Sequence, residues 1–301
     1  MAYQRGDYMT HLIRQMGYVV IATTDPEGSA ADLADITGVH VTHRDADAVY
    51  VSSNARFCDV AYVRSDRSGI RAVGLEAIDE AAVDEVLSRA KSDGLTILSD
   101  KPAVPHVKRA VRFATPYGPI IEVHTPVVRQ SVGPEVSNGR RVRRLEHVNL
   151  RATDPRAFHD LVTGMLGMKL SDRTTNYERA WYRAADGFHH TFAAGPGNGL
   201  HHYAFDAHGL HDLAGVADVL AGKGRTLLWG LGRHGPGNNL FSYYLDPNGC
   251  VVEVSSGLER IDNDDLYEPG NWAFDSARNV LDRWGSKPPD AYGKALTPFV
   301  T

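Results

Sequence analysis

The sequence predicts an α+β fold of two homologous lobes, each built from paired βαβββ units. The first observation is an internal repeat: "MGYVVIATTDP" (16–26) and "LEHVNLRATDP" (145–155) are alternating strands that end in Thr-Asp-Pro, 129 residues apart. A similar spacing of 130 separates "GIRAVGLE" (69–76) from "GLHHYAFD" (199–206). It is 131 between "YGPIIEV" (117–123) and "NGCVVEV" (248–254). With 301 residues and 43% hydrophobic content, the chain can bury a substantial core, and its length suggests about two domains.

The second observation is the order of periodic segments within each copy. After the first strand we expect a helix that a glycine ends, Gly38 in one copy and Gly167 in the other. Further along the first copy, the strand "RAVGLEA" precedes the helical "DEAAVDEVLSRAKSDG" and the strands "LTIL", "AVRFAT" and "IIEVH". A strand, a helix and then several strands is the order of a βαβββ unit.

These patterns divide the chain into four segments. We expect an N-terminal lobe without a metal site at 1–126 and a C-terminal catalytic lobe at 143–258. The stretch 127–142 is rich in polar residues, Pro and Gly and is predicted to be a linker. The tail at 259–301 is predicted to be irregular and either packed on a lobe or a mobile cover.

Composition favours a cytoplasmic enzyme that acts on small molecules. The net charge is −5 and no long basic segment occurs, which argues against nucleic acid as the main partner. No apolar run is long enough to span a membrane, and the N-terminal residues lack the apolar core of a secretory signal. Two cysteines, Cys58 and Cys250, are too few for a disulfide framework.

The two copies differ at positions that folding alone does not explain. Tyr18 of the first copy corresponds to His147 of the second, and Ala72 corresponds to His202. A glutamate is retained in both copies, within a run of valine or isoleucine where a carboxylate needs a cation. The second copy therefore holds two histidines and one carboxylate: His147, His202 and Glu253.

Two histidines and one carboxylate form the facial triad of non-haem Fe(II), which leaves coordination positions open on one side. All three side chains fall in strand-like segments, which hold ligands at fixed angles. The alternative interpretation is that the histidines are ordinary half-buried residues and that an arginine neutralises Glu253.

With these residues in place, the chain resembles the type I extradiol ring-cleaving dioxygenases of the vicinal oxygen chelate superfamily. The resemblance covers both lobes. It is carried by a motif that runs from Gly-x-His through a Tyr and an Asp-Pro-x-Gly turn to a Glu, present here as "GRHGPGNNLFSYYLDPNGCVVE" (232–253). One departure is Ser242, where the family usually has an apolar residue.

The resemblance implies an activity and roles for named residues. It implies ring cleavage of a catecholic substrate by O2 at Fe(II), with Mn(II) as the less expected metal, in a homo-oligomer. His147, His202 and Glu253 would bind the metal. In each histidine doublet, "LHHYAFD" and "FHHTFA", the family's pattern implies that the second member faces the site, and the first should then face away, because strand neighbours point to opposite sides. His190 would be the acid–base residue. His234 and Tyr243 would form hydrogen bonds with the substrate hydroxyl and the reacting oxygen.

Two other functions remain open from sequence. A metal-dependent isomerase or lyase of the glyoxalase kind would share the fold but typically uses an additional carboxylate ligand. A non-catalytic binding protein for aromatic compounds would share it without an intact metal site.

Overall fold

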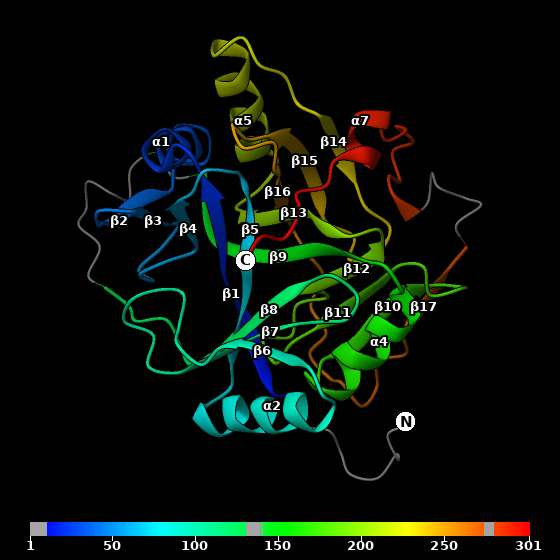
Figure 1. Cartoon of the computed structure of the whole chain (residues 1–301). Coiled ribbons are helices and arrows are strands. Elements are labelled where there is room, and N and C mark those ends of the chain that lie inside the picture. Colours follow the sequence, from blue (N-terminus) through cyan, green and yellow to red (C-terminus); the bar gives the residue numbers. More distant parts are fainter. Residues whose placement is uncertain (1–10, 131–138, 140, 274–279) are drawn as a thin grey trace.

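The structure, a computed structural model, describes residues 11–130, 139, 141–273 and 280–301. The described strands form two β-sheets, and the helices lie on their outer sides (Figure 1). The expected α+β fold is confirmed.

The first sheet holds eight strands in the order β2-β3-β4-β1-β5-β8-β7-β6. Its strands are β1 (Ile13–Thr23), β2 (His40–Arg44), β3 (Ala48–Ser52), β4 (Val60–Arg64), β5 (Gly69–Ala77), β6 (Thr96–Ser99), β7 (Ala110–Ala114) and β8 (Ile120–His124).

The second sheet holds nine strands in the order β14-β15-β16-β13-β9-β12-β11-β10-β17. Its strands are β9 (Val142–Ala152), β10 (Lys169–Thr174), β11 (Ala180–Arg183), β12 (Phe192–Pro196), β13 (Gly199–Ala207), β14 (Trp229–Arg233), β15 (Leu240–Leu245), β16 (Val251–Ser256) and β17 (Gly270–Trp272).

The two sheets have the same topology. When β9 to β16 are matched with β1 to β8 in chain order, the strand orders are identical except for the added β17. The central pairs agree in register as well, because Val20 faces Ala72 between β1 and β5, and Asn149 faces His202 between β9 and β13. The sequence repeat is therefore a structural repeat.

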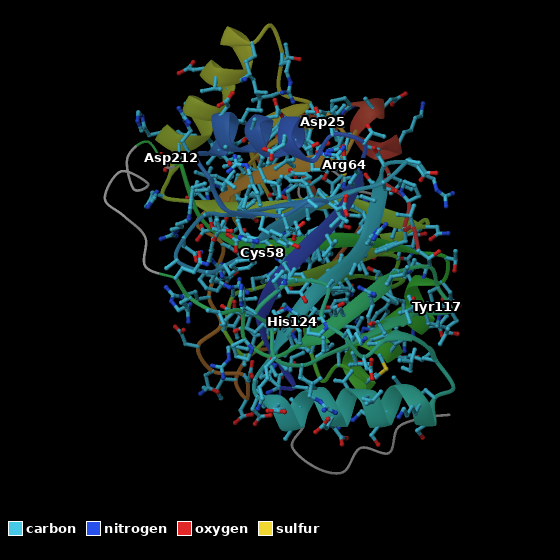
Figure 2. The ribbon with its side chains drawn as sticks, turned by 60° about the vertical axis from the view of Figure 1, so that its left-hand side comes forward. Asp25, Cys58, Arg64, Tyr117, His124 and Asp212 are labelled. Atoms are coloured by element: carbon cyan, nitrogen blue, oxygen red, sulfur yellow. The ribbon has the colours of Figure 1, made fainter. Side chains whose placement is uncertain are left out.

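Matching helices begin with the same cap. The Asp of each Thr-Asp-Pro accepts a backbone hydrogen bond in the first turn, Asp25 (labelled in Figure 2) from Gly28 and Asp154 from Ala157, and proline occupies the first turn. These helices are α1 (Pro26–Thr37) and α4 (Pro155–Gly164), and the second pair is α2 (Glu80–Ser92) and α5 (Leu210–Gly222).

The two predicted helix ends differ. Gly38 ends α1 in the left-handed conformation, at φ 79°, as expected. Gly167 also has a positive φ, 63°, but α4 already ends at Gly164, a residue of poor helix propensity. A short turn therefore separates α4 from its glycine.

The two lobes contact each other through α1 and α5, which lie near one another in Figure 1. Arg225, just beyond α5, pairs with Asp32 at 2.6 Å, and Lys223 pairs with Asp35 at 2.8 Å. The larger hydrophobic core includes residues of both sheets, so the lobes share buried surface.

Of the predicted linker at 127–142, residues 131–138 and 140 lie outside the described residues. The tail is more regular than expected, because β17 extends the second sheet beside β10 and a short helix, α7 (Asp290–Lys294), follows. The last residues pair with both lobes: Leu200 exchanges backbone hydrogen bonds with Thr297, and Ile70 bonds to Pro298 and Val300. None of the described helices is long and apolar enough to cross a membrane.

Candidate metal centre and active site

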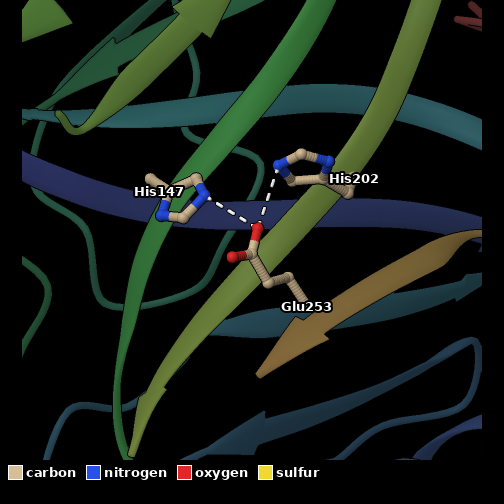
Figure 3. Close-up of side chains that lie close together, drawn as sticks. All are labelled: His147, His202 and Glu253. Carbon is tan, nitrogen blue, oxygen red and sulfur yellow. Dashed lines mark hydrogen bonds and ion pairs between the residues drawn. The ribbon is translucent and has the colours of Figure 1, made fainter. Parts of the chain in front are cut away.

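Three strands bring His147, His202 and Glu253 together in the second lobe (Figure 3). His147 comes from β9, His202 from β13 and Glu253 from β16. Nε2 of His147 lies 3.1 Å from Glu253 Oε2, and Nε2 of His202 lies 3.2 Å from the same oxygen. One ligand atom of each residue lies within 4.8 Å of the other two, and all three residues are buried. Such a group can hold a divalent metal ion.

Glu253 is 1% exposed and has no arginine or lysine within 4.0 Å among the described residues. Its Oε1 accepts a hydrogen bond from Asn239 at 3.3 Å and lies 3.7 Å from His234. A carboxylate buried among imidazoles fits a divalent cation better than any interpretation in which an arginine neutralises it.

The equivalent carboxylate of the first lobe is satisfied differently. Glu122 pairs with Arg112 at 3.2 Å and accepts hydrogen bonds from the Tyr18 hydroxyl and the Ala103 backbone. Burial raises the pKa of Glu122 against the opposing effect of these partners. The position that corresponds to the metal-ligand group therefore holds, in the first lobe, the ion pair of Glu122 with Arg112 and the phenol of Tyr18.

The register identifies which second-lobe residue corresponds to Arg112. Arg112 stands opposite Glu122 between β7 and β8, and Tyr243 stands opposite Glu253 between β15 and β16. In place of the arginine, the second lobe therefore has a phenol beside its carboxylate. This difference leaves the charge of Glu253 available to a metal.

Hydrogen bonds orient His202 for metal binding. Nε2 of His201 donates to the Tyr292 carbonyl at 3.0 Å, which leaves His201 Nδ1 as an acceptor in the neutral ring. Nδ1 of His202, at 2.7 Å, then donates to it, so that His202 Nε2 carries a lone pair toward the site. Burial, together with the charges of His201 and His147, holds the pKa of His202 well below its usual value.

His147 is oriented by its own neighbour in the chain. Its Nδ1 donates to the buried Glu146 carboxylate at 3.1 Å, and Arg144 pairs with that carboxylate at 3.3 Å. Burial lowers the pKa of His147, but Glu253 and Glu146 outweigh this effect and raise the pKa to about 9. A carboxylate that holds the second nitrogen of a ligand histidine is a common feature of metal sites.

His234 and Tyr243 form a hydrogen-bonded pair beside the triad. Nδ1 of His234 donates to the Leu281 carbonyl at 2.5 Å, so its Nε2 accepts from the Tyr243 hydroxyl at 2.8 Å. Burial, opposed by Glu253, lowers the pKa of His234; burial and Glu253 together raise that of Tyr243. Tyr244 faces the other way, into the larger core.

His190 also lines the site, and its ring packs edge-on against His147 with centroids 4.4 Å apart. Its Nδ1 lies 3.0 Å from His189 Nδ1, and His189 Nε2 lies 3.1 Å from Asp172 on the side away from the pocket. Burial first, and then the charge of His147, holds the pKa of His190 well below its usual value. His190 is therefore a neutral imidazole.

A cavity of about 460 Å³ extends from the triad. All six candidate residues line it: His147, His190, His202, His234, Tyr243 and Glu253. Trp181 of β11 forms one wall, and Pro288, Pro289 and Tyr292 of the tail form another. The tail is therefore part of the pocket wall.

Several pocket residues were not identified from sequence. Asn149 and Arg151 follow His147 at alternate positions of β9, a period that would have placed them on the same face. Asn239 lies within the motif itself. Tyr292 and the buried orienting residue Glu146 carried no periodic or motif signal.

Comparison with known proteins identifies a family domain in the second lobe. Residues 144–254 match the Glyoxalase/Bleomycin resistance protein/Dioxygenase superfamily. Metapyrocatechase 2 of Cupriavidus necator is 32% identical over 50% of this chain, although the match spans only 47% of that protein. The manganese-dependent 2,3-dihydroxybiphenyl 1,2-dioxygenase of Geobacillus genomosp. 3 is 25% identical over 88% of this chain and 91% of its own length.

Solved structures share the whole fold. A mutant of homoprotocatechuate 2,3-dioxygenase from Brevibacterium fuscum superposes with a TM-score of 0.88 at 20% identity, covering 97% of this chain and 84% of that one. The Mn(II)-bound glyoxalase from Novosphingobium aromaticivorans superposes with a TM-score of 0.83 at 27% identity, covering 93% and 94%. Residues 144–254 therefore form a domain of the Glyoxalase/Bleomycin resistance protein/Dioxygenase superfamily, and the two-lobed architecture is the vicinal oxygen chelate fold that the solved extradiol ring-cleaving dioxygenase shares.

Proposed function

We propose that this protein cleaves the ring of a catecholic substrate with O2 next to its diol, and that both oxygen atoms enter a ring-opened semialdehyde acid. The observation that carries the proposal is the buried triad of His147, His202 and Glu253 within a pocket that also holds His190, His234 and Tyr243. The balance needs no external reductant, because the four electrons that reduce O2 come from the substrate.

The triad is proposed to bind Fe(II), with Mn(II) as the alternative. Its imidazole and carboxylate donors suit both metals. A metal in this position would supply Lewis acidity toward the catechol hydroxyls and an open face for the reactants. The relay from the Tyr292 carbonyl through His201 keeps a lone pair on His202 Nε2, and the contact of Glu146 with Nδ1 of His147 directs Nε2 of that ring toward Glu253.

His190 is proposed to accept a proton from a catechol hydroxyl. The contact with His189 occupies its Nδ1, so Nε2 is the nitrogen left for the substrate. A neutral imidazole is the form that can act as a base, and burial keeps His190 in that form. The same nitrogen can return the proton later in the reaction.

Tyr243 and His234 are proposed to orient the substrate hydroxyl and the reacting oxygen. The Tyr243 hydroxyl is fixed by its donation to His234 Nε2, and the Leu281 carbonyl fixes His234 in turn. Groups held in this way stabilise charge without reorganising when it develops. Trp181 and the tail residues exclude water and provide an apolar surface for an aromatic ring.

Oxygen uptake on a catechol panel tests the proposal. Protein purified without oxygen and loaded with Fe(II) should consume O2 and produce a yellow ring-opened compound from at least one monocyclic or bicyclic catechol. The His147→Ala variant should lose its metal and this activity. If oxygen uptake is absent across the panel in metal-loaded protein, the dioxygenase proposal is wrong.

The glyoxalase-type alternative has one observation in its favour, the similarity to a protein named as a glyoxalase. Within the described residues, however, the group of His, Cys, Asp and Glu side chains that could hold a metal contains one carboxylate, that of Glu253. Isomerisation of a thiol adduct without oxygen uptake would favour the alternative. Tight binding of aromatic compounds without turnover would favour a binding protein.

The remaining assignments are part of the proposal. The lobe at 1–126 serves as a scaffold without a metal site, residues 127–142 are a linker, 143–258 form the catalytic lobe and 259–301 the tail. We also propose a cytoplasmic homo-oligomer. Both cysteines are free and buried, which is compatible with a reducing compartment, and light scattering of the purified protein would measure the oligomeric state.

A further inference from the structure

Two arginines line the same cavity as the triad. Arg151 lies on β9, four residues after His147 and on the same face, which is about 13 Å along the strand. Arg179 directly precedes β11 and lines the cavity beside Trp181. Arg151 and Arg179 therefore line one cavity together with His202 and Tyr243.

A glycine makes room for both guanidinium groups. Gly195 of β12 pairs with Arg151 of β9. A Cβ atom added to Gly195 would lie 2.0 Å from Arg151 Nη1 and 3.0 Å from Arg179 Nη1. Both guanidinium groups therefore lie in the space beside Gly195 that a larger side chain would fill.

The first lobe has none of these features at the equivalent positions. The registers of β1 with β4 and of β3 with β4 place Ala22, Ala48 and Val63 where the second lobe has Arg151, Arg179 and Gly195. The fold therefore accepts small apolar residues at these three positions. The arginines occur only in the lobe that carries the triad.

Arg151 is 8% exposed, and within the described part of the chain no carboxylate lies within 4.0 Å of it. The cavity contains two acidic side chains, Glu253 of the triad and Asp290, which is almost fully exposed and lies 3.7 Å from Lys294. A buried cation without an anion is costly, and a guanidinium presents a fork of donors that matches a carboxylate.

We infer that the substrate carries a carboxylate, which Arg151 binds with Arg179 beside it, while the diol faces the triad. This inference rests on the proposed function and specifies its substrate class as catechols with an acidic substituent. The anion would replace the missing partner of Arg151 and fix the ring between the two ends of the cavity.

The test compares acids with their neutral isosteres on the metal-loaded wild-type enzyme. The probes are dihydroxybenzoates, dihydroxyphenylacetates and dihydroxyphenylpropanoates, each with its carboxamide, and unsubstituted catechol as a neutral reference. For at least one length of the acidic substituent, kcat/KM of the acid should exceed that of its amide about 30-fold or more. This is the effect expected when one partner of a buried charge pair is left unpaired. Anaerobic calorimetry should show the same preference in binding, without turnover.

Variants assign the preference to Arg151. Arg151→Gln should lower the ratio of acid to amide in both kcat/KM and binding by at least about tenfold, and Arg151→Lys should restore part of it, because the charge returns without the fork. Lys294→Gln removes a charge at the exposed mouth of the same cavity and should change the ratio less than about twofold, because exposed charges are screened. Circular dichroism checks that each variant is folded.

The outcomes separate the inference from the proposed function. Equal binding and turnover of acids and amides, with catechols still cleaved, would overturn the inference and leave the function intact. A preference for acids that Arg151→Gln retains would overturn the role of Arg151. Failure to bind or cleave any catechol would remove the function and the inference together.

Discussion

The Tyr18 hydroxyl donates a hydrogen bond to the buried Glu122 carboxylate in the first lobe. In the second copy of the repeat the same two positions hold His147 and Glu253, 3.1 Å apart. The carboxylate that both copies retain therefore has two different environments. In the first lobe protein groups are its partners, and in the second lobe its surroundings suit a metal.

The two glutamates should respond differently to the same change. Glu253→Gln removes an anionic ligand, and the purified variant should retain less than about a tenth of the wild-type metal. Glu122→Gln should retain full metal content but lower the free energy of unfolding by about 1 to 3 kcal/mol, because Arg112 loses its buried partner. Metal analysis and urea unfolding measure the two effects. Equal metal loss in both variants would contradict the distinction.

Tyr243 and His234 should act as one unit. Tyr243→Phe removes the hydroxyl that donates to His234 and should lower kcat by roughly 10- to 100-fold with metal content unchanged. The double variant Tyr243→Phe/His234→Asn should lose less than the product of the two single losses, because each single change already breaks the shared contact.

Tyr244→Phe is the matched control for this pair. Tyr244 is the next residue of β15, and its buried hydroxyl has no hydrogen-bond partner among the described groups. Loss of that hydroxyl should change kcat less than about twofold, because it breaks no hydrogen bond and Tyr244 faces the core rather than the cavity. A loss in Tyr244→Phe as large as in Tyr243→Phe would show that the effect is one of packing.

Asp246 should make the protein less stable as the pH rises from about 4 to 6. Burial raises the pKa of this carboxyl from 3.8 to about 6, so the folded state binds the proton more tightly than the unfolded state. The favourable contribution of Asp246 to the free energy of unfolding is fully present below pH 3.8. As the pH approaches 6, about 3 kcal/mol of this contribution is lost. Asp246→Asn keeps an acceptor for the backbone of Asn248 and Cys250 and should be more stable relative to wild type at pH 7 than at pH 4.

Urea unfolding at the two pH values measures this change. The exposed Asp66 provides a control, because Asp66→Asn should shift the midpoint by a similar small amount at both. If Asp246→Asn follows the wild-type pH profile, the carboxyl does not carry the dependence.

The tail should contribute to substrate binding separately from metal binding. Tyr292→Ala keeps the backbone carbonyl that accepts from His201, so metal content should not change. It removes a ring from the cavity wall, and kcat/KM should fall roughly tenfold, equivalent to about 1.4 kcal/mol. Steady-state kinetics and metal analysis distinguish the two effects, and loss of metal would contradict this division of roles.

Sequence reasoning located the triad because the repeat provides an internal comparison. Tyr18 against His147 and Ala72 against His202 are differences that local propensity does not explain, and the structure brings the two histidines and Glu253 together. The same comparison, continued along β9 to the fourth residue after His147, finds Arg151 in the second copy where the first copy has Ala22. That difference becomes interpretable only when β12 and β11 are known to lie beside it.

Other features depend on contacts that no local pattern encodes. The His201 ring donates to the backbone carbonyl of Tyr292, 91 positions away. Every residue has such a carbonyl, so the residue type at position 292 does not indicate this contact. The tail carries turn-forming residues that predicted irregular structure, yet tertiary pairing makes β17 an edge strand beside β10. The helix α4 also ends at Gly164, before Gly167, the glycine that the pattern predicted to end it.

The most direct test of the central claim is anomalous X-ray diffraction from crystals grown with Fe(II) or Mn(II). The account predicts one strong peak within bonding distance of His147 Nε2, His202 Nε2 and the Glu253 carboxylate, and none beside Tyr18, Arg112 and Glu122. A map with no peak at the triad in metal-saturated crystals, or with equal peaks in both lobes, would contradict it.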